Sequence, residues 1–70
     1  MKLYDVYVEE YSNNEFDSVL VVAADEQSAL RLVATGYFGK SYFKPHQGTP
    51  KIKQIDLKKE QVVYASFNEV

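Results

Sequence analysis

The chain has 70 residues, a net charge of −2 and no cysteine, and 46% of its residues are hydrophobic. This length predicts a single domain over residues 1–70, and the apolar content is too high for a disordered chain. The lack of cysteine excludes disulfides, thiolate zinc sites and cysteine nucleophiles, and it makes a reducing cytoplasm the expected location. The longest apolar run, residues 19–24, is far too short to span a membrane. We expect no leader peptide, because the first strand pattern follows Met1 directly.

The charges are unevenly distributed along the chain. Residues 1–30 contain seven acidic residues and one basic residue, whereas residues 31–59 contain seven basic residues and one acidic residue. The middle of the chain is therefore basic although the whole protein is acidic.

The first half of the sequence predicts a β-hairpin. Residues 3–11 alternate between two faces and are rich in aromatic and β-branched side chains, which is typical of a strand. Asn13 and Asn14 favour a tight turn. Residues 16–24 then form a second strand, and its Val-Leu-Val-Val run predicts a central position in the sheet. With a two-residue turn, three cross-strand pairs would share one face: Val8–Val19, Val6–Val21 and Tyr4–Ala23.

A helix follows the hairpin. Asp25 is a typical N-cap, and apolar residues recur at helical spacing up to Tyr37. Either Gly36 or Gly39 could end the helix, and we expect Gly39 because Tyr37 and Phe38 continue the pattern. Residues 39–51 form a long loop, and strands are predicted at residues 52–57 and 62–67. The predicted fold class is α+β with the order β-β-α-β-β, in two layers: a four-stranded, mostly antiparallel sheet with one helix on one face.

The sequence offers little for catalysis. It has one histidine, His46, and its three glycines are scattered, so neither a two-histidine metal site nor a phosphate-binding glycine-rich loop can be built within one chain. Glu10 and Asp17 would face each other in the hairpin, which we interpret as a solvated strand end rather than an acid–base pair. We therefore expect no enzyme, no metal, no cofactor and no small-molecule ligand.

The first candidate site is the sheet face opposite the helix. One helix cannot cover both faces of the sheet, and exposed apolar patches of this kind often mark interfaces. The face carries Leu3, Tyr7, Tyr11, Phe16, Leu20 and Val22. We expect it to bind a protein partner or a second copy of the chain, giving a homodimer. In the alternative, the long loop and the C-terminal tail fold over this face.

The second candidate site lies in the loop region 40–53. Its basic residues alternate with aromatic rings, as in proteins that bind the phosphates and bases of single-stranded nucleic acid. The residues are Lys40, Tyr42, Phe43, Lys44, His46, Lys51 and Lys53. In the alternative, the lysines are solvated and Tyr42 or Phe43 is packed into the core.

The acidic hairpin supports a third hypothesis. Its carboxylates could imitate phosphates to a host nucleic-acid-binding protein, as in a phage-type inhibitor; they are Glu9, Glu10, Glu15 and Asp17. The hairpin could equally meet the basic middle segment, either of a partner or of the same chain.

One family resemblance covers residues 3–34. The pattern Tyr4-x-Val6-x-Val8-x-Glu10, followed by Val21-Val22-Ala23-Ala24 and by Asp25-Glu26-x-x-Ala29-Leu30, resembles the DpnD/PcfM-like small proteins of Gram-positive bacteria and their mobile elements. The resemblance implies no catalytic residues. It implies a small accessory protein of a plasmid, phage or restriction locus.

Overall fold

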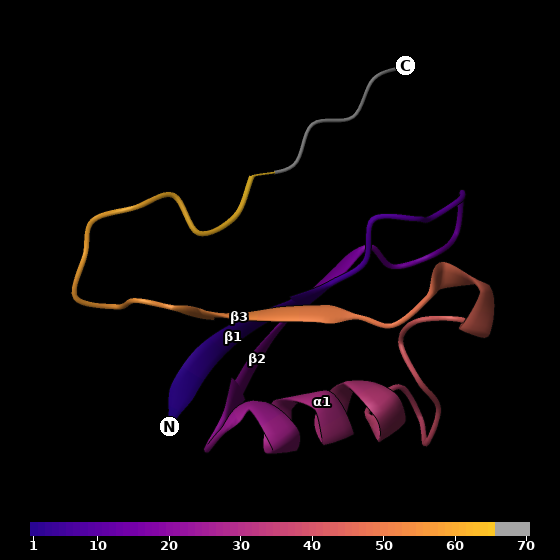
Figure 1. Ribbon diagram of the computed structural model, residues 1–70, viewed down its shortest axis with the longest axis horizontal. Helices are drawn as coiled ribbons and strands as arrows, with labels where there is room; N and C mark the ends of the chain where they lie inside the picture. The colour runs from indigo at the N-terminus through magenta and orange to yellow at the C-terminus, as the bar shows by residue number, and fades with distance from the viewer. Residues whose placement is uncertain (66–70) are drawn as a thin grey trace.

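The structure is a computed structural model that describes residues 1–65, and it is built around a three-stranded sheet with one helix on one face (Figure 1). The elements are β1 (Lys2–Tyr7), β2 (Ser18–Ala23), α1 (Glu26–Thr35), a single 3₁₀ turn η1 (Pro45–Gln47) and β3 (Lys51–Ile55). All strand pairs are antiparallel, and the strand order is β2-β1-β3. The α+β class and the two layers are confirmed.

The prediction of a fourth strand is wrong. Residues 62–65 form no strand, and residues 66–67 of the predicted segment lie outside the described residues. After β3 the chain turns, with the Lys58 N–H donating to the Asp56 carboxylate at 2.9 Å, and it runs back on the side of the sheet opposite α1 (Figure 1). Val62 remains exposed there. An alternating apolar pattern becomes a strand only when a neighbouring strand pairs with it.

The prediction that residues 16–24 form a central strand is also wrong. β1 is the central strand, and β2 lies at one edge of the sheet. The apolar run in β2 has a different cause: Val21 and Ala23 pack in the core, while Leu20 and Val22 point to the other face and stay exposed.

The hairpin register differs by two residues from the predicted one. Val6 pairs with Val19 and Tyr4 with Val21, because the last hydrogen bond of the hairpin runs from the Val8 N–H to the Asp17 carbonyl (2.9 Å) and a long connection follows. Asn14 adopts a left-handed conformation within this connection, with φ of +67°. A shift of two residues leaves every side chain on its predicted face.

The helix begins as predicted but ends early. The Asp25 carboxylate accepts a hydrogen bond from the Ser28 N–H at 2.8 Å, which caps the helix N-terminus. α1 ends at Thr35, with Gly36 as its C-cap, rather than near Gly39. A Cβ atom at Gly36 would collide with the Leu32 backbone oxygen and lie 3.3 Å from the Tyr42 ring, so this position requires glycine.

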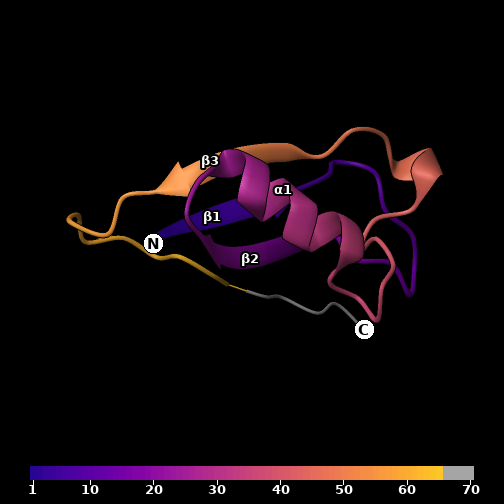
Figure 2. The same ribbon diagram turned by 90° about the horizontal axis from the view of Figure 1, so that it is seen from below.

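The core lies between α1 and the sheet. α1 crosses β1 and β2, as Figure 2 shows, and it buries Ala29 and Val33 against them. The sheet contributes Tyr4, Val6, Val8, Val21 and Ala23 to this core, and the loop after α1 contributes Phe43. Within residues 1–65, α1 is too short and too polar to cross a membrane.

Candidate interaction surface at the open edge of the sheet

The aromatic rings of the basic loop are largely occupied by packing. Phe43 is only 5% exposed and belongs to the hydrophobic core. Tyr42 is half-buried, and its ring lies 5.2 Å from that of Phe16 in an edge-to-face contact. The predicted stacking surface for nucleic-acid bases therefore lacks its Phe43 ring. The alternative, in which these rings pack inside, describes the structure better.

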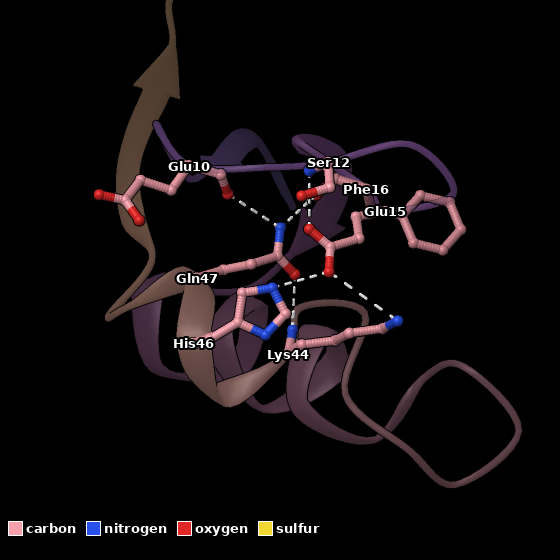
Figure 3. Close-up of polar contacts among 7 residues, drawn as sticks. All are labelled: Glu10, Ser12, Glu15, Phe16, Lys44, His46 and Gln47. Carbon is pink, nitrogen blue, oxygen red and sulfur yellow. Dashed lines mark hydrogen bonds and ion pairs between the residues drawn. The ribbon is translucent and has the colours of Figure 1, made fainter.

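Three of the predicted basic residues pair with acids of the hairpin connection (Figure 3 shows two of them). His46 Nε2 lies 2.8 Å from a Glu15 carboxylate oxygen, and Lys44 Nζ lies 3.9 Å from the same oxygen. Lys51 donates a hydrogen bond to the exposed Glu9 carboxylate, which lowers the pKa of Glu9 and raises that of Lys51. The acidic and basic halves of the sequence thus meet within one chain.

A buried glutamine fixes the loop to the hairpin connection. The Gln47 side-chain amide donates to the Glu10 carbonyl (3.1 Å) and to the Phe16 carbonyl (2.9 Å) (Figure 3). Its side-chain oxygen accepts from the Lys44 N–H at 2.6 Å. Sequence reasoning missed Gln47, because a glutamine in a polar loop carries no pattern that distinguishes it from an exposed one.

Glu15 is held inside this junction. Its side chain is 6% exposed, and its second oxygen accepts from the Ser12 N–H at 2.8 Å. The carboxylate therefore points into the protein. It is not available to imitate a phosphate toward a partner of the acidic hairpin. Lys40 and Lys53 remain exposed, and neither forms an ion pair within residues 1–65.

The predicted apolar face is present but smaller than expected. Leu3, Tyr7, Leu20 and Val22 do lie opposite α1, because each sits one residue along from a core position. Tyr11 and Phe16 lie beyond the strands, and Phe16 turns to pack against Tyr37 at 5.4 Å. Their placement on the sheet face was wrong, since the longer connection removes both from the paired strands.

The strand register shows how the residues of this face are ordered. One row across the sheet, Val22–Leu3–Ile55, is entirely apolar, whereas the next row is Leu20–Asp5–Lys53. The third row, Ser18–Tyr7–Lys51, is mostly polar, and the Ser18 hydroxyl donates to the Asp5 carboxylate at 2.7 Å. The exposed apolar surface therefore follows β2, where Leu20 is 41% and Val22 is 62% exposed.

Within residues 1–65 the chain covers only part of the sheet face opposite α1: Ile55 is 8% exposed, and the segment after β3 runs back on this side (Figure 1). The long loop packs on the helix side, through Phe43, and does not cover it. Residues 63–65 lie near the hairpin connection, where they line a hollow together with Asp5 and Ser18. Leu20 and Val22 stay exposed.

The outer edge of β2 also offers backbone hydrogen-bonding groups. Val8 and Asp17 form a hydrogen-bonded pair, and such pairs alternate along an antiparallel ladder. Val19, Val21 and Ala23 therefore direct their N–H and C=O groups at β1, whereas those of Ser18, Leu20 and Val22 point outward. Within residues 1–65 no strand pairs with this edge.

The two edges of the sheet differ in charge. β2 carries no charged side chain, while β3 carries Lys51 and Lys53 among its five residues. Lysines on an edge strand commonly protect it against pairing with other chains, and an uncharged apolar edge lacks this protection. Beside β2, a groove of about 300 Å³ runs toward α1, with the half-exposed Leu32 on its helix side.

An exposed aromatic turn follows α1. Tyr37 and Lys40 exchange backbone hydrogen bonds of 3.1 and 3.0 Å around Phe38 and Gly39. Both central residues have positive φ, +54° for Phe38 and +81° for Gly39, as in a type I′ turn. Phe38 is 92% exposed, so a bulky residue holds a strained conformation without burying its ring.

Neither metal ligation nor similarity to known proteins adds to this description. In the described part of the chain, no three His, Cys, Asp or Glu side chains lie close enough together to hold a metal ion. No family model, curated protein or solved structure matches the chain. The resemblance to DpnD/PcfM-like proteins stays a prediction.

Proposed function

We propose that this protein is a protein-interaction domain that binds an extended segment of its partner along the outer edge of β2. A single observation carries the proposal: β2 is an uncharged edge strand with outward-pointing backbone groups and exposed Leu20 and Val22 side chains. Strand addition at such an edge uses main-chain hydrogen bonds for affinity and alternate side chains for specificity. The mobile-element or phage setting belongs to this proposal on the sequence resemblance alone.

The other two hypotheses have less support. A nucleic-acid site in the loop would have to work without the buried Phe43 ring and with Lys44, His46 and Lys51 already paired to carboxylates. A phosphate-imitating hairpin would lack the Glu15 carboxylate, which is buried.

Site-specific photocrosslinking in cells tests the proposal. A photoreactive amino acid is placed at position 22, on the edge of β2, and for comparison at position 53, on the opposite edge of the sheet. We expect an adduct of defined mass from position 22 that is absent from position 53. Equal labelling from both positions, or none from position 22, would refute a binding site at β2.

A further inference from the structure

The geometry of the β2 edge points to a specific occupant: we infer that β2 pairs in antiparallel fashion with β2 of a second copy of this chain. The inference rests on the proposed function, because it identifies the partner of the same edge. It joins two three-stranded sheets into one continuous sheet across a two-fold axis.

The sequence of β2 is complementary to itself in one register. With the two-fold axis at Val21, Leu20 of each copy faces Val22 of the other, and these residues supply the outward backbone groups. On the helix side, Val21 faces its own counterpart and Val19 faces Ala23. Every pair within the strand is then apolar, and cross-strand apolar pairs are what stabilise a sheet.

A second, equally uncharged β2 strand also matches the uncharged edge of β2 better than a charged foreign strand does. No position within β2 carries a charge, so a charged side chain placed opposite Leu20 or Val22 would find no ion-pair partner in the strand. The same pairing is blocked at β3, where Lys51 and Lys53 would face like charges on a second β3 strand.

The two-fold arrangement places like faces together. Directly paired residues share a face, so both α1 helices lie on one side of the joined sheet and both Leu20–Val22 surfaces lie on the other. The exposed Leu32 borders β2 on the helix side, and it would flank the added strand there. The monomer keeps its own core, Tyr4 and Val6 included, so the dimer is expected to be reversible.

The acidic residues at the strand ends set a distinctive salt dependence. Asp17 precedes β2 and Asp25 follows it, so antiparallel self-pairing brings Asp17 of one copy toward Asp25 of the other. Salt screens such repulsion and should strengthen the dimer. A complex with a basic partner would respond in the opposite way.

The test measures molar mass and amide exchange on the wild-type chain over a concentration and salt series. We expect the mass to rise with concentration toward twice the 8.0 kDa of the monomer, and to rise further with salt. In the dimer, the amides of Ser18, Leu20 and Val22 should gain protection, whereas those of Val19 and Val21 should change little because they already bond to β1.

Two variants separate edge pairing from general apolar association. Leu20→Lys places a charge at the paired edge and should abolish dimer formation, while Leu57→Lys makes the same change at an exposed position away from β2 and should leave it intact. Far-UV circular dichroism confirms that both fold, and Val22→Lys replaces Leu20→Lys if that variant unfolds.

The remaining outcomes all count against self-pairing through β2. If the protein is monomeric at every concentration and position 22 crosslinks to a different protein, self-pairing is overturned. The proposed function is left standing by that result. A monomer whose outward β2 amides are already protected would show that the chain's own C-terminal segment occupies the edge, which overturns both. A dimer insensitive to Leu20→Lys and Val22→Lys would move the contact to another surface.

Discussion

Replacing Phe43 with alanine tests whether the basic loop is part of the core or part of a binding site. The Phe43 ring is 5% exposed and packs with the core residues of β1, β2 and α1. Truncating a buried phenylalanine costs about 3–5 kcal/mol, from lost transfer energy and from the cavity that remains. A domain of this size has about 3–5 kcal/mol of stability in total. We therefore expect Phe43→Ala to be largely unfolded at 25 °C.

Urea denaturation measures this effect, followed by far-UV circular dichroism and by tyrosine fluorescence, since the chain has no tryptophan. Phe38→Ala is the matched control, because it removes a ring of the same loop region that is 92% exposed. Phe43→Leu keeps most of the buried volume and should retain the fold. If Phe43→Ala lost less than about 1 kcal/mol, a value typical of an exposed site, the packing argument would be refuted.

Three further predictions concern the turn, the loop junction and the helix cap. Phe38→Asn should raise the free energy of unfolding by about 1 kcal/mol, because asparagine tolerates the positive φ and little buried area is lost; a lower urea midpoint would contradict this. Gln47→Ala should destabilise by about 1–3 kcal/mol, because it leaves the Glu10 carbonyl and its other partners without their hydrogen bonds, and faster amide exchange in residues 44–48 would accompany the loss. Hydrogen bonds from the backbone N–H and then the side chain of Ser28 lower the pKa of Asp25, so the stabilising effect of Asp25 is complete above the ordinary carboxyl pKa of about 4 and is lost as the pH falls through the lowered value. Asp25→Asn keeps a cap that does not titrate, so the stability advantage of the wild type over this variant should shrink between pH 6 and pH 2.5, and a constant difference would count against it.

The sequence predicted well those features that depend on local periodicity. The strand alternation in residues 3–8 assigns the buried face of β1 correctly, and the helical spacing does so for Ala29 and Val33, whereas Leu30, Ala34 and Tyr37 of the same apolar pattern stay exposed. The strand prediction survives the change of register, because a shift of two residues returns every side chain to the same face. The Asp25 cap was likewise predicted, since its hydrogen bond spans only three residues.

Features that depend on distant contacts could not be read from the sequence. A run such as Val19–Val22 is equally consistent with a buried central strand and with an edge strand that exposes alternate residues. Phe43 stands beside Lys44 in a loop sequence, and only the closure of residues 41–47 over the sheet shows that it is core. Predicting that Leu20, Asp5 and Lys53 lie in one row also requires the β1–β3 register, and no local pattern specifies that register.

Acidic and basic segments of the sequence form ion pairs with each other within one molecule, and this affects which surface is left for a partner. The buried Glu15 carboxylate meets the exposed side chains of His46 and Lys44, and Glu9 meets Lys51 at the surface. These ion pairs hold the loop against the hairpin connection, so three of the bases that suggested nucleic-acid binding (Lys44, His46 and Lys51) connect two segments of one chain. The β2 edge takes no part in this pairing, and it is uncharged and carries exposed apolar residues. A partner is therefore expected to be recognised there through backbone hydrogen bonds and apolar contact, with charge acting only at the two acidic ends of the strand.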